Sequence, residues 1–188
     1  MSAEKFKNLL VSKRVTFGYI FAVLFVIFAE PPSVLFFVIG LEIVIFGEAV
    51  RIWASGYVKK GEALAVNGPY GYVRHPLYLG SFLVGTGFCV AAQSINLFIL
   101  FLVLFGLVYR YAAAHEEKSL QQKFGVEFVE YKESVPFFLP AFSPYSTNIL
   151  SKFGWDQVMD NKEYRSWYGI LIITAILGAK LYLLYKPQ

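Results

Sequence analysis

"LYLGSFLVGTGFCVAAQSINLFILFLVLFGLVYRYAAA", residues 77–114, decides how this chain folds. The stretch holds two apolar runs, residues 77–92 and 97–114, and only the four residues 93–96 separate them. Each run approaches the roughly 20 residues that a helix needs to cross a bilayer. Because the connection is so short, we expect the two runs to form an antiparallel helical hairpin.

Three more apolar runs extend this pattern over the rest of the chain. They cover about residues 15–29, 33–53 and 167–185. Pro31 and Pro32 end the first of them, since a proline pair cannot continue a helix. Of the 188 residues, 57% are hydrophobic and 16% are charged, which departs strongly from soluble domains. We therefore predict an all-α integral membrane protein, a single domain over residues 1–188 with five transmembrane helices.

Lysine and arginine residues are distributed unequally across this arrangement. If the five runs alternate in direction, nearly all of these residues lie on one side, and only Lys180 and Lys186 fall toward the other. Positive charge marks the cytoplasmic side of a multi-pass protein. The amino terminus, residues 68–80 and the segment 115–166 are therefore predicted to face the cytoplasm, with the chain in the inner or plasma membrane of the cell.

The net charge of +4 does not indicate a nucleic-acid partner. The basic residues are scattered beside apolar runs and form no cluster on a soluble face, so anionic membrane lipids are the expected partners. Cys89 is the only cysteine, which excludes a disulfide framework or a thiolate metal cluster. The sequence leaves the oligomeric state open.

"GPYGYVRHPLYLG", residues 68–80, concentrates polar and turn-forming residues at the mouth of the third apolar run. Its glycines and first proline fit a turn, and Pro76 suits the first position of a helix. Arg74 and His75 precede that helix amino terminus, where backbone donors favour anions. Gly80 permits the close approach of a backbone or a ligand. A binding site and an interfacial anchor explain these residues equally well.

"HEEKSLQQKFGVEFVEYKESVPFFLP", residues 115–140, begins where the fourth run ends. The predicted topology places Glu116 and Glu117 at the same interface as His75. Taken alone, two adjacent carboxylates are more often a solvated helix start than a site. Apolar residues at helical spacing from Leu120 to Phe128 predict an amphipathic helix, which Gly125 should bend or break.

Two further features accompany these blocks. The sequence "PFFLPAFSPY", residues 136–145, has the composition of extended chain at the headgroup boundary. Glu42, Glu48 and Arg51 lie within the second apolar run, where charge is costly. Glu48 and Arg51 are three residues apart and share a helix face, so they either neutralise each other or line a polar cavity. Glu42 is expected to be protonated or paired across helices.

Together the two blocks resemble those of the integral-membrane methyltransferases typified by isoprenylcysteine carboxyl methyltransferase and the phospholipid methyltransferases. The likeness covers about residues 45–140, including "RIWASGYVKKGEAL" upstream. It depends on an R-H-P-x-Y-x-G block followed, after a helical hairpin, by an E-E-x-x-L block. The resemblance implies that S-adenosylmethionine binds at the cytoplasmic membrane face and that a lipid-like acceptor enters from the bilayer.

The resemblance also implies which residues form the site. The predicted catalytic residues are Arg74, His75, Glu117 and Arg110. The predicted cofactor-binding residues are Glu62, Ala63, Leu64, Ala65, Tyr70, His75, Pro76, Leu77, Tyr78, Gly80, Glu116, Glu117 and Tyr131. Carboxyl-methylating members place an arginine about one turn before the acidic pair, but residues 112–114 are alanines in this chain. Arg110 or Arg51 is the candidate replacement.

Methyl transfer needs no metal, so none is expected. A carboxylate acceptor needs no base, whereas an amine or hydroxyl acceptor does, and His75 or the acidic pair is the nearest candidate. Two alternatives to a methyltransferase remain. A membrane-embedded NADPH-dependent reductase of the sterol-reductase type resembles these enzymes near the carboxyl end, and a non-catalytic scaffold explains the five apolar runs alone.

Overall fold

A computed structural model describes residues 14–30, 32–59, 63–145 and 152–185 of the chain. Within these residues the secondary structure is entirely helical, which confirms the predicted all-α class. The elements are α2 (Arg14–Phe28), α3 (Val34–Ser55), the short 3-10 helix η1 (Gly68–Gly71), α4 (Pro76–Ala91), α5 (Ile95–Phe124), α6 (Val126–Ser134), α7 (Trp155–Asp160) and α8 (Tyr164–Tyr185).

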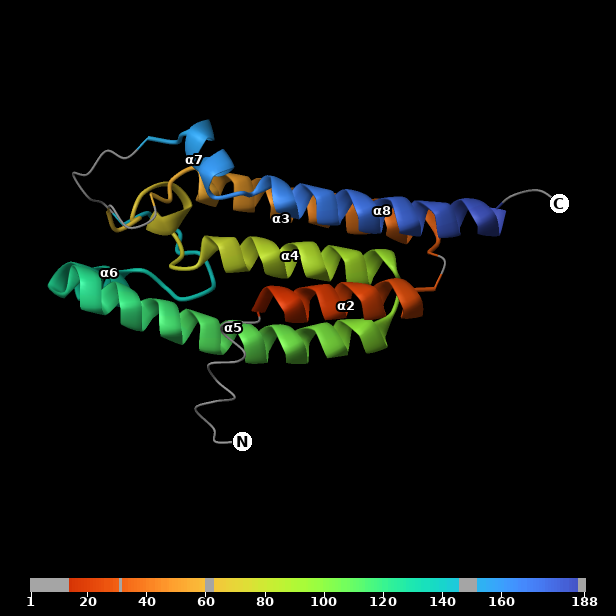
Figure 1. The fold of residues 1–188 in the computed structure, drawn as a ribbon, viewed down its shortest axis with the longest axis horizontal. Helices are drawn as coiled ribbons and strands as arrows, with labels where there is room; N and C mark the ends of the chain where they lie inside the picture. Colours follow the sequence, from red (N-terminus) through yellow and green to blue (C-terminus); the bar gives the residue numbers. More distant parts are fainter. Residues whose placement is uncertain (1–13, 31, 60–62, 146–151, 186–188) are drawn as a thin grey trace.

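Five long helices lie side by side along the long axis of the molecule (Figure 1). They are α2, α3, α4, α5 and α8, and each corresponds to one predicted apolar run. The short elements η1, α6 and α7 gather at one end of this bundle (Figure 1). We call this the α6–α7 end.

The predicted hairpin of α4 and α5 is confirmed. Helix α4 ends at Ala91 and α5 begins at Ile95, so the turn occupies only three residues. Gln93 adopts a φ of 53° in that turn. The hydroxyl of Ser94 then accepts a hydrogen bond from the backbone N–H of Leu97 at 3.3 Å, which caps the amino terminus of α5.

Helices α3 and α4 pack closely because glycines face each other across the interface. A methyl group added to Gly47 would lie 2.8 Å from the carbonyl oxygen of Gly80, and one added to Gly40 would lie 2.5 Å from that of Gly87. Within a membrane, small residues are the usual means of bringing two helix backbones together. Residues 76–80, the part of the R-H-P-x-Y-x-G block that lies in the first turns of α4, are thereby fixed against α3.

Helix α8 packs against α2 and α3 and completes the apolar core. Its Leu177 is buried together with Phe25 of α2, Val44 of α3 and Phe88 of α4. Lys180 donates hydrogen bonds to the carbonyl oxygens of Val26 and Ala29, at 2.8 and 2.6 Å. Both carbonyl groups lie at the carboxyl end of α2, where the last carbonyls of a helix have no partner within the helix. Lys180 therefore acts as a carboxyl-terminal cap that is supplied by another helix.

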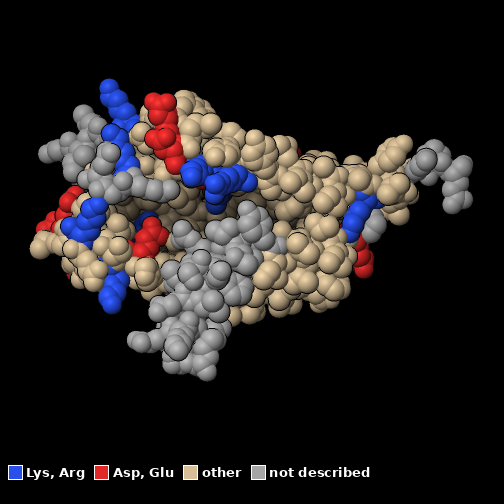
Figure 2. All heavy atoms as spheres, in the orientation of Figure 1, with Lys and Arg blue, Asp and Glu red and all other residues tan. Residues whose placement is uncertain are grey.

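Two of the described helices, α5 and α8, are long and apolar enough to cross a bilayer. Helix α4 is apolar but has only 16 residues. Helix α3 has 22 residues, but any 18-residue stretch of it includes Glu42, Glu48 and Arg51. Five crossings therefore stay a prediction. Figure 2 shows most visible charged side chains at the α6–α7 end and a long region of uncharged surface beside them.

Helix α5 is longer than the apolar run from which it was predicted. Its 30 residues extend about 45 Å, so the turns after Ala114 project beyond a hydrocarbon layer of about 30 Å. The expected amphipathic helix is the continuation of α5 up to Phe124. Gly125 then adopts a φ of 57°, which ends α5 and lets α6 begin in a new direction, as predicted.

Candidate active site

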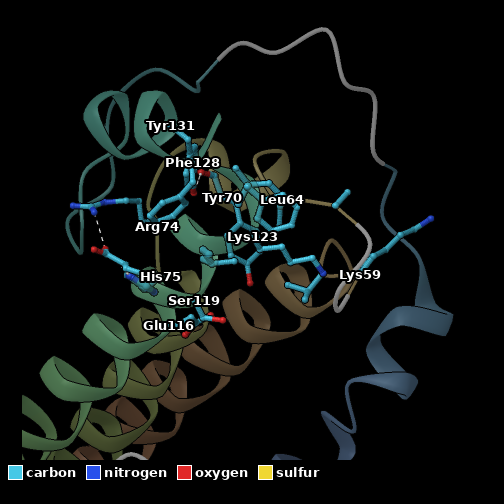
Figure 3. Close-up of a pocket in the computed structure, with 16 residues that line it drawn as sticks. Lys59, Leu64, Tyr70, Arg74, His75, Glu116, Ser119, Lys123, Phe128 and Tyr131 are labelled. Atoms are coloured by element: carbon cyan, nitrogen blue, oxygen red, sulfur yellow. Dashed lines mark hydrogen bonds and ion pairs between the residues drawn. The ribbon is translucent and has the colours of Figure 1, made fainter. Parts of the chain in front are cut away.

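A cavity of about 310 Å³ lies at the α6–α7 end (Figure 3). Its walls come from the connection between α3 and α4, the last turns of α5, and α6. The residues that line it are Val58, Lys59, Ala63, Leu64, Ala65, Tyr70, Arg74, His75, Glu116, Glu117, Ser119, Leu120, Lys123, Phe124, Phe128 and Tyr131. The two sequence blocks singled out above therefore enclose one cavity.

Backbone hydrogen bonds tie the two blocks together. The N–H of Arg74 donates to the carbonyl oxygen of Pro136 at 2.9 Å, and the N–H of Ala141 donates to that of Tyr72 at 2.8 Å. A third bond, 2.8 Å long, joins the N–H of Tyr145 to the oxygen of Gly71. The aromatic, proline-rich segment 136–145 is thus fixed against residues 71–74.

Glu117 is the centre of the charged groups in the cavity. Its Oε1 atom lies 2.7 Å from Nη1 of Arg74 and 3.2 Å from Nε2 of His75. Its Oε2 atom lies 2.7 Å from Nζ of Lys132 on α6. Both oxygens are therefore occupied, and the carboxylate joins α5, α6 and the residues before α4. Figure 3 shows the contact with Arg74.

Glu116 has a different environment, although it is the adjacent residue. The hydroxyl of Tyr78 donates to its Oε2 atom at 2.6 Å. The side chain is exposed and lines the cavity, and no described residue pairs with its Oε1 atom. Because neighbouring helical residues point about 100° apart, Glu117 faces the internal cations while Glu116 offers an oxygen to a ligand.

The ring of His75 is held between two aromatic side chains. It stacks on Tyr78 with the ring centres 5.1 Å apart, and Phe137 contacts it edge-on at 5.0 Å. The guanidinium of Arg74 lies 5.5 Å from the centre of the Phe137 ring. His75 is 6% exposed, so packing and the bond to Glu117 together fix its orientation.

Two buried phenols complete the inner wall. The hydroxyl of Tyr131 donates to the carbonyl oxygen of Tyr70 at 2.8 Å. Burial raises the pKa of Tyr70 well above its ordinary value, and nearby Glu116 adds to this effect. Burial also raises the pKa of Tyr131. Both phenols therefore stay protonated well into the alkaline range, and Tyr131 remains a hydrogen-bond donor.

A second charged cluster lies outside the cavity, where α3, α4 and α8 meet. Nε of Arg51 is 3.3 Å from Oε2 of Glu48, and Nη2 of Arg51 is 2.5 Å from Oε1 of Glu163. Arg51 also donates to the hydroxyl of Ser81, and the Ser166 hydroxyl donates to Glu48 at 2.9 Å. The predicted Glu48–Arg51 pair is present, and none of these residues lines the cavity.

The structure gathers most of the predicted site residues. Those that line the cavity are Ala63, Leu64, Ala65, Tyr70, Arg74, His75, Glu116, Glu117 and Tyr131. Tyr78 reaches the site through its bond to Glu116, and Leu77 packs beside Tyr78 against Ala112 and Ala113. Pro76 is buried at the start of α4. Glu62 lies outside the described residues.

Two predicted residues are placed elsewhere. Gly80 faces α3, where an added methyl group would lie 2.5 Å from Cγ of Arg51, so it serves helix packing and does not line the cavity. Arg110 is exposed on α5 and does not line the cavity either. Arg51 is engaged by Glu48 and Glu163. Glu42 is exposed on α3, and within the described chain it has no ion-pair partner.

Sequence reasoning missed part of the site. The sequence predicts an apolar helix face made of Leu120, Phe124 and Phe128, but it does not indicate what this face contacts. In the structure all three side chains line the cavity. Their spacing of four residues continues from Glu116, which was the available signal. The contact between Lys132 and Glu117 had no signal in the sequence, because Gly125 redirects the chain between them.

Comparisons with known proteins show which family the middle of the chain matches. A family model described as phospholipid methyltransferase matches residues 34–127. The nickel-cobalt-cadmium resistance protein NccN of Alcaligenes xylosoxydans xylosoxydans is 31% identical over 107 residues. The cobalt-zinc-cadmium resistance protein CzcN of Cupriavidus metallidurans is 30% identical over 115 residues. The human protein-S-isoprenylcysteine O-methyltransferase is 32% identical over 115 residues.

These matches cover only part of each protein. They include 56, 60 and 55% of this chain, in the same order. They include 50, 53 and 40% of the respective relatives, so the chain spans about half of their length or less. No solved structure matches significantly.

Proposed function

Because this chain belongs to the phospholipid methyltransferase family, we propose that it is an S-adenosylmethionine-dependent methyltransferase that acts on a lipid-like, amphiphilic acceptor. Half of the chain, residues 34–127, carries the family match, and the human enzyme similar to it is an O-methyltransferase by name. The proposal covers the cofactor, the reaction and the acceptor class.

One observation carries the proposal: groups of opposite charge face one cavity of suitable size. Its volume of about 310 Å³ lies at the small end of the range for small-molecule sites. S-adenosylmethionine carries an ammonium, a carboxylate, a cationic sulfur and an adenine ring, so its site needs an anion, a cation and an apolar surface. The cavity lining contains all three.

Each part of the cofactor has a candidate partner. Glu116 would hold the ammonium, because its Oε1 atom is not engaged by a described residue. Arg74 would hold the carboxylate, because its Nη1 contact with Glu117 leaves other guanidinium hydrogens. Leu120, Phe124 and Phe128 would form the apolar wall beside the adenine. The bound cofactor supplies a methyl group that is activated by a positively charged sulfur.

The protein's own contribution is to position the reacting groups and exclude water. Holding two reactants at attack distance replaces an encounter in solution, an effect worth about 7–11 kcal/mol in favourable cases. The segment 136–145 is bonded to residues 71–74 and sets the Phe137 ring against His75. The rings of Tyr78 and Phe137 shield His75 from solvent.

We place this reaction at the cytoplasmic face of the inner membrane, in a multi-pass chain. The cavity lies at the α6–α7 end, where visible charge gathers, beside a long uncharged surface (Figure 2). A polar cofactor from the cytoplasm and an apolar acceptor from the bilayer meet at such a boundary. The description of the family as phospholipid methyltransferase, and the name of the human relative, an isoprenylcysteine O-methyltransferase, support the lipid-like acceptor.

Methyl incorporation tests the proposal. Membranes that contain the protein are incubated with S-adenosylmethionine labelled in its methyl group, and the lipid extract is counted. We expect label above that of membranes without the protein. Glu116→Gln should reduce incorporation, whereas Lys118→Gln, an exposed neighbour on α5 that does not line the cavity, should not. Equal labelling with and without the protein would refute the proposal.

A further inference from the structure

We infer that Asn161, in the turn between α7 and α8, is a positioning residue for the cofactor cavity. Its side chain holds the chain at the end of α3 and so fixes the cavity wall at Val58 and Lys59. The inference rests on the proposed function and adds to it a residue that does not itself line the cavity. Asn161 lies outside residues 34–127, which the family model matches, so the match gives it no role.

The amide of Asn161 uses both of its hydrogens on this wall. Nδ2 donates to the carbonyl oxygen of Ser55 at 2.9 Å and to that of Val58 at 3.0 Å. A side-chain amide has two N–H donors, so both are occupied. Ser55 is the last residue of α3, and Val58 lines the cavity. Because the last carbonyls of a helix have no partner within it, Asn161 caps α3 from another segment and holds the chain where it enters the cavity wall.

The chain just after α3 has few bonds of its own. Helical bonding ends with the N–H of Gly56, which donates to the carbonyl oxygen of Ile52 at 3.1 Å. The N–H groups of Tyr57 and Val58 then reach back only three residues, at 3.1 and 3.3 Å. A short turn at the end of a helix opens more readily than the packed helix itself. Contacts from another segment therefore decide how firmly Val58 and Lys59 are held as a cavity wall.

The residues just before α7 contact the same turn. The N–H of Gly154 donates to the carbonyl oxygen of Gly56 at 3.0 Å. The ring of Phe153 packs edge-on against Tyr57, with the ring centres 6.1 Å apart. Tyr57 in turn lies against Gly68, where an added methyl group would come within 2.5 Å of its ring. The contacts therefore run from the segment before α7, through Tyr57, to η1 beside the cavity.

The position of Asn161 is itself fixed by the fold. Its own N–H donates to the carbonyl oxygen of Gln157 at 2.9 Å, which ends α7. Lys162 follows with a φ of 59°, and this left-handed residue turns the chain toward α8. Glu163 then pairs with Arg51, one turn before the end of α3. Two side chains of one tight turn thus hold the last two turns of α3, and Figure 1 shows α7 beside that end of the helix.

Asn161→Ala tests this role. Without the two hydrogen bonds the wall adopts other arrangements part of the time, and the apparent affinity for a ligand falls with the fraction of molecules that remain competent. We expect the Kd for S-adenosylmethionine to rise by about 3–10-fold. The rate at saturating substrates should stay within about twofold, because Asn161 does not line the cavity. A bond that served folding alone would lower the melting temperature and leave the Kd unchanged.

The Kd is measured by titrating the purified, detergent-solubilised protein with S-adenosylmethionine, and Asp160→Ala, an exposed neighbour on α7 that does not line the cavity, is the control. An unchanged Kd in Asn161→Ala, or an equal rise in Asp160→Ala, would overturn the inference and leave the proposed function standing. Absence of binding by the wild type would refute both. If Asn161→Ala does not fold, Phe153→Leu loosens the same segment against Tyr57 and is judged by the same rise in Kd.

Discussion

Oε1 of Glu117 contacts His75 and Arg74 at once, at 3.2 Å from Nε2 and 2.7 Å from Nη1. Glu117 lies near the end of α5, and the other two residues precede α4, more than 40 positions earlier in the chain. One carboxylate thus joins the two sequence blocks on which the functional assignment depends.

Glu117→Gln should weaken both the fold and the site. The substitution removes the negative charge that three cationic or donor groups share, so Arg74 and Lys132 lose their common anion. Leaving half-buried polar groups without a full partner costs about 1–3 kcal/mol. We expect a lower melting temperature in detergent and loss of methyl transfer. Lys118→Gln is the control, and equal melting temperatures for the two variants would contradict this account.

Gly47→Ala should destabilise the protein through the α3–α4 interface. The added methyl group would meet the carbonyl oxygen of Gly80 at 2.8 Å, and backbone cannot move aside as a side chain can. Overpacking of this kind costs about 1–3 kcal/mol. Gly106→Ala on α5 is the matched control, since nothing lies within 4 Å of its added methyl group. Equal thermal stability of the two variants would show that α3 and α4 are not so closely packed.

Tyr131→Phe should reduce stability and alter its pH dependence. The variant loses the 2.8 Å hydrogen bond to the carbonyl oxygen of Tyr70, which costs about 0.5–1.5 kcal/mol. Burial raises the pKa of Tyr131, so above about pH 10 the unfolded chain loses this proton while the folded protein keeps it. The stability from this phenol therefore falls as the pH rises.

Melting curves of the wild type and Tyr131→Phe between pH 9 and 11 test this prediction. The melting temperature of the wild type should decline more steeply than that of the variant. The difference in unfolding free energy between the two proteins should change by up to about 1.4 kcal/mol per pH unit, which is the contribution of the one phenol. The other titrating groups are the same in both proteins and cancel in the comparison. Parallel declines would mean that the Tyr131 phenol titrates normally in the folded state.

Arg110→Ala should leave methyl transfer unchanged within about twofold. The residue is exposed on α5 and does not line the cavity, so it is not positioned to orient an acceptor. Kinetics at varied acceptor concentration check this point. A large rise in the KM for the acceptor would restore Arg110 to the site and count against the structural placement.

The sequence predicted the helices well because their signals are local. Apolar runs, the proline pair and Gly125 set the helix ends to within a few residues, apart from the continuation of α5. The polar blocks were also found correctly as neighbours in space. Both kinds of signal depend on residues close together in the chain.

Contacts between distant segments had no such signal. Asn161 donates from its side chain to the carbonyl oxygens of Ser55 and Val58, at 2.9 and 3.0 Å, and so ties the α7 region to a wall of the cavity. Glu163, which lies just before α8, forms an ion pair with Arg51 of α3 and is a second contact of this kind between distant segments. The direction of a side chain on a helix also depends on its packing partner, which is why neither Gly80 nor Arg110, both predicted site residues, lines the cavity.

Equilibrium binding to the purified, detergent-solubilised protein tests the central claim most directly. We predict saturable binding of S-adenosylmethionine, weakened about 10–100-fold in Glu116→Gln because a charge-assisted hydrogen bond is lost, and unchanged in Lys118→Gln. NADPH should not compete. Tight binding of NADPH with no binding of S-adenosylmethionine would contradict the account and assign the cavity to a reductase.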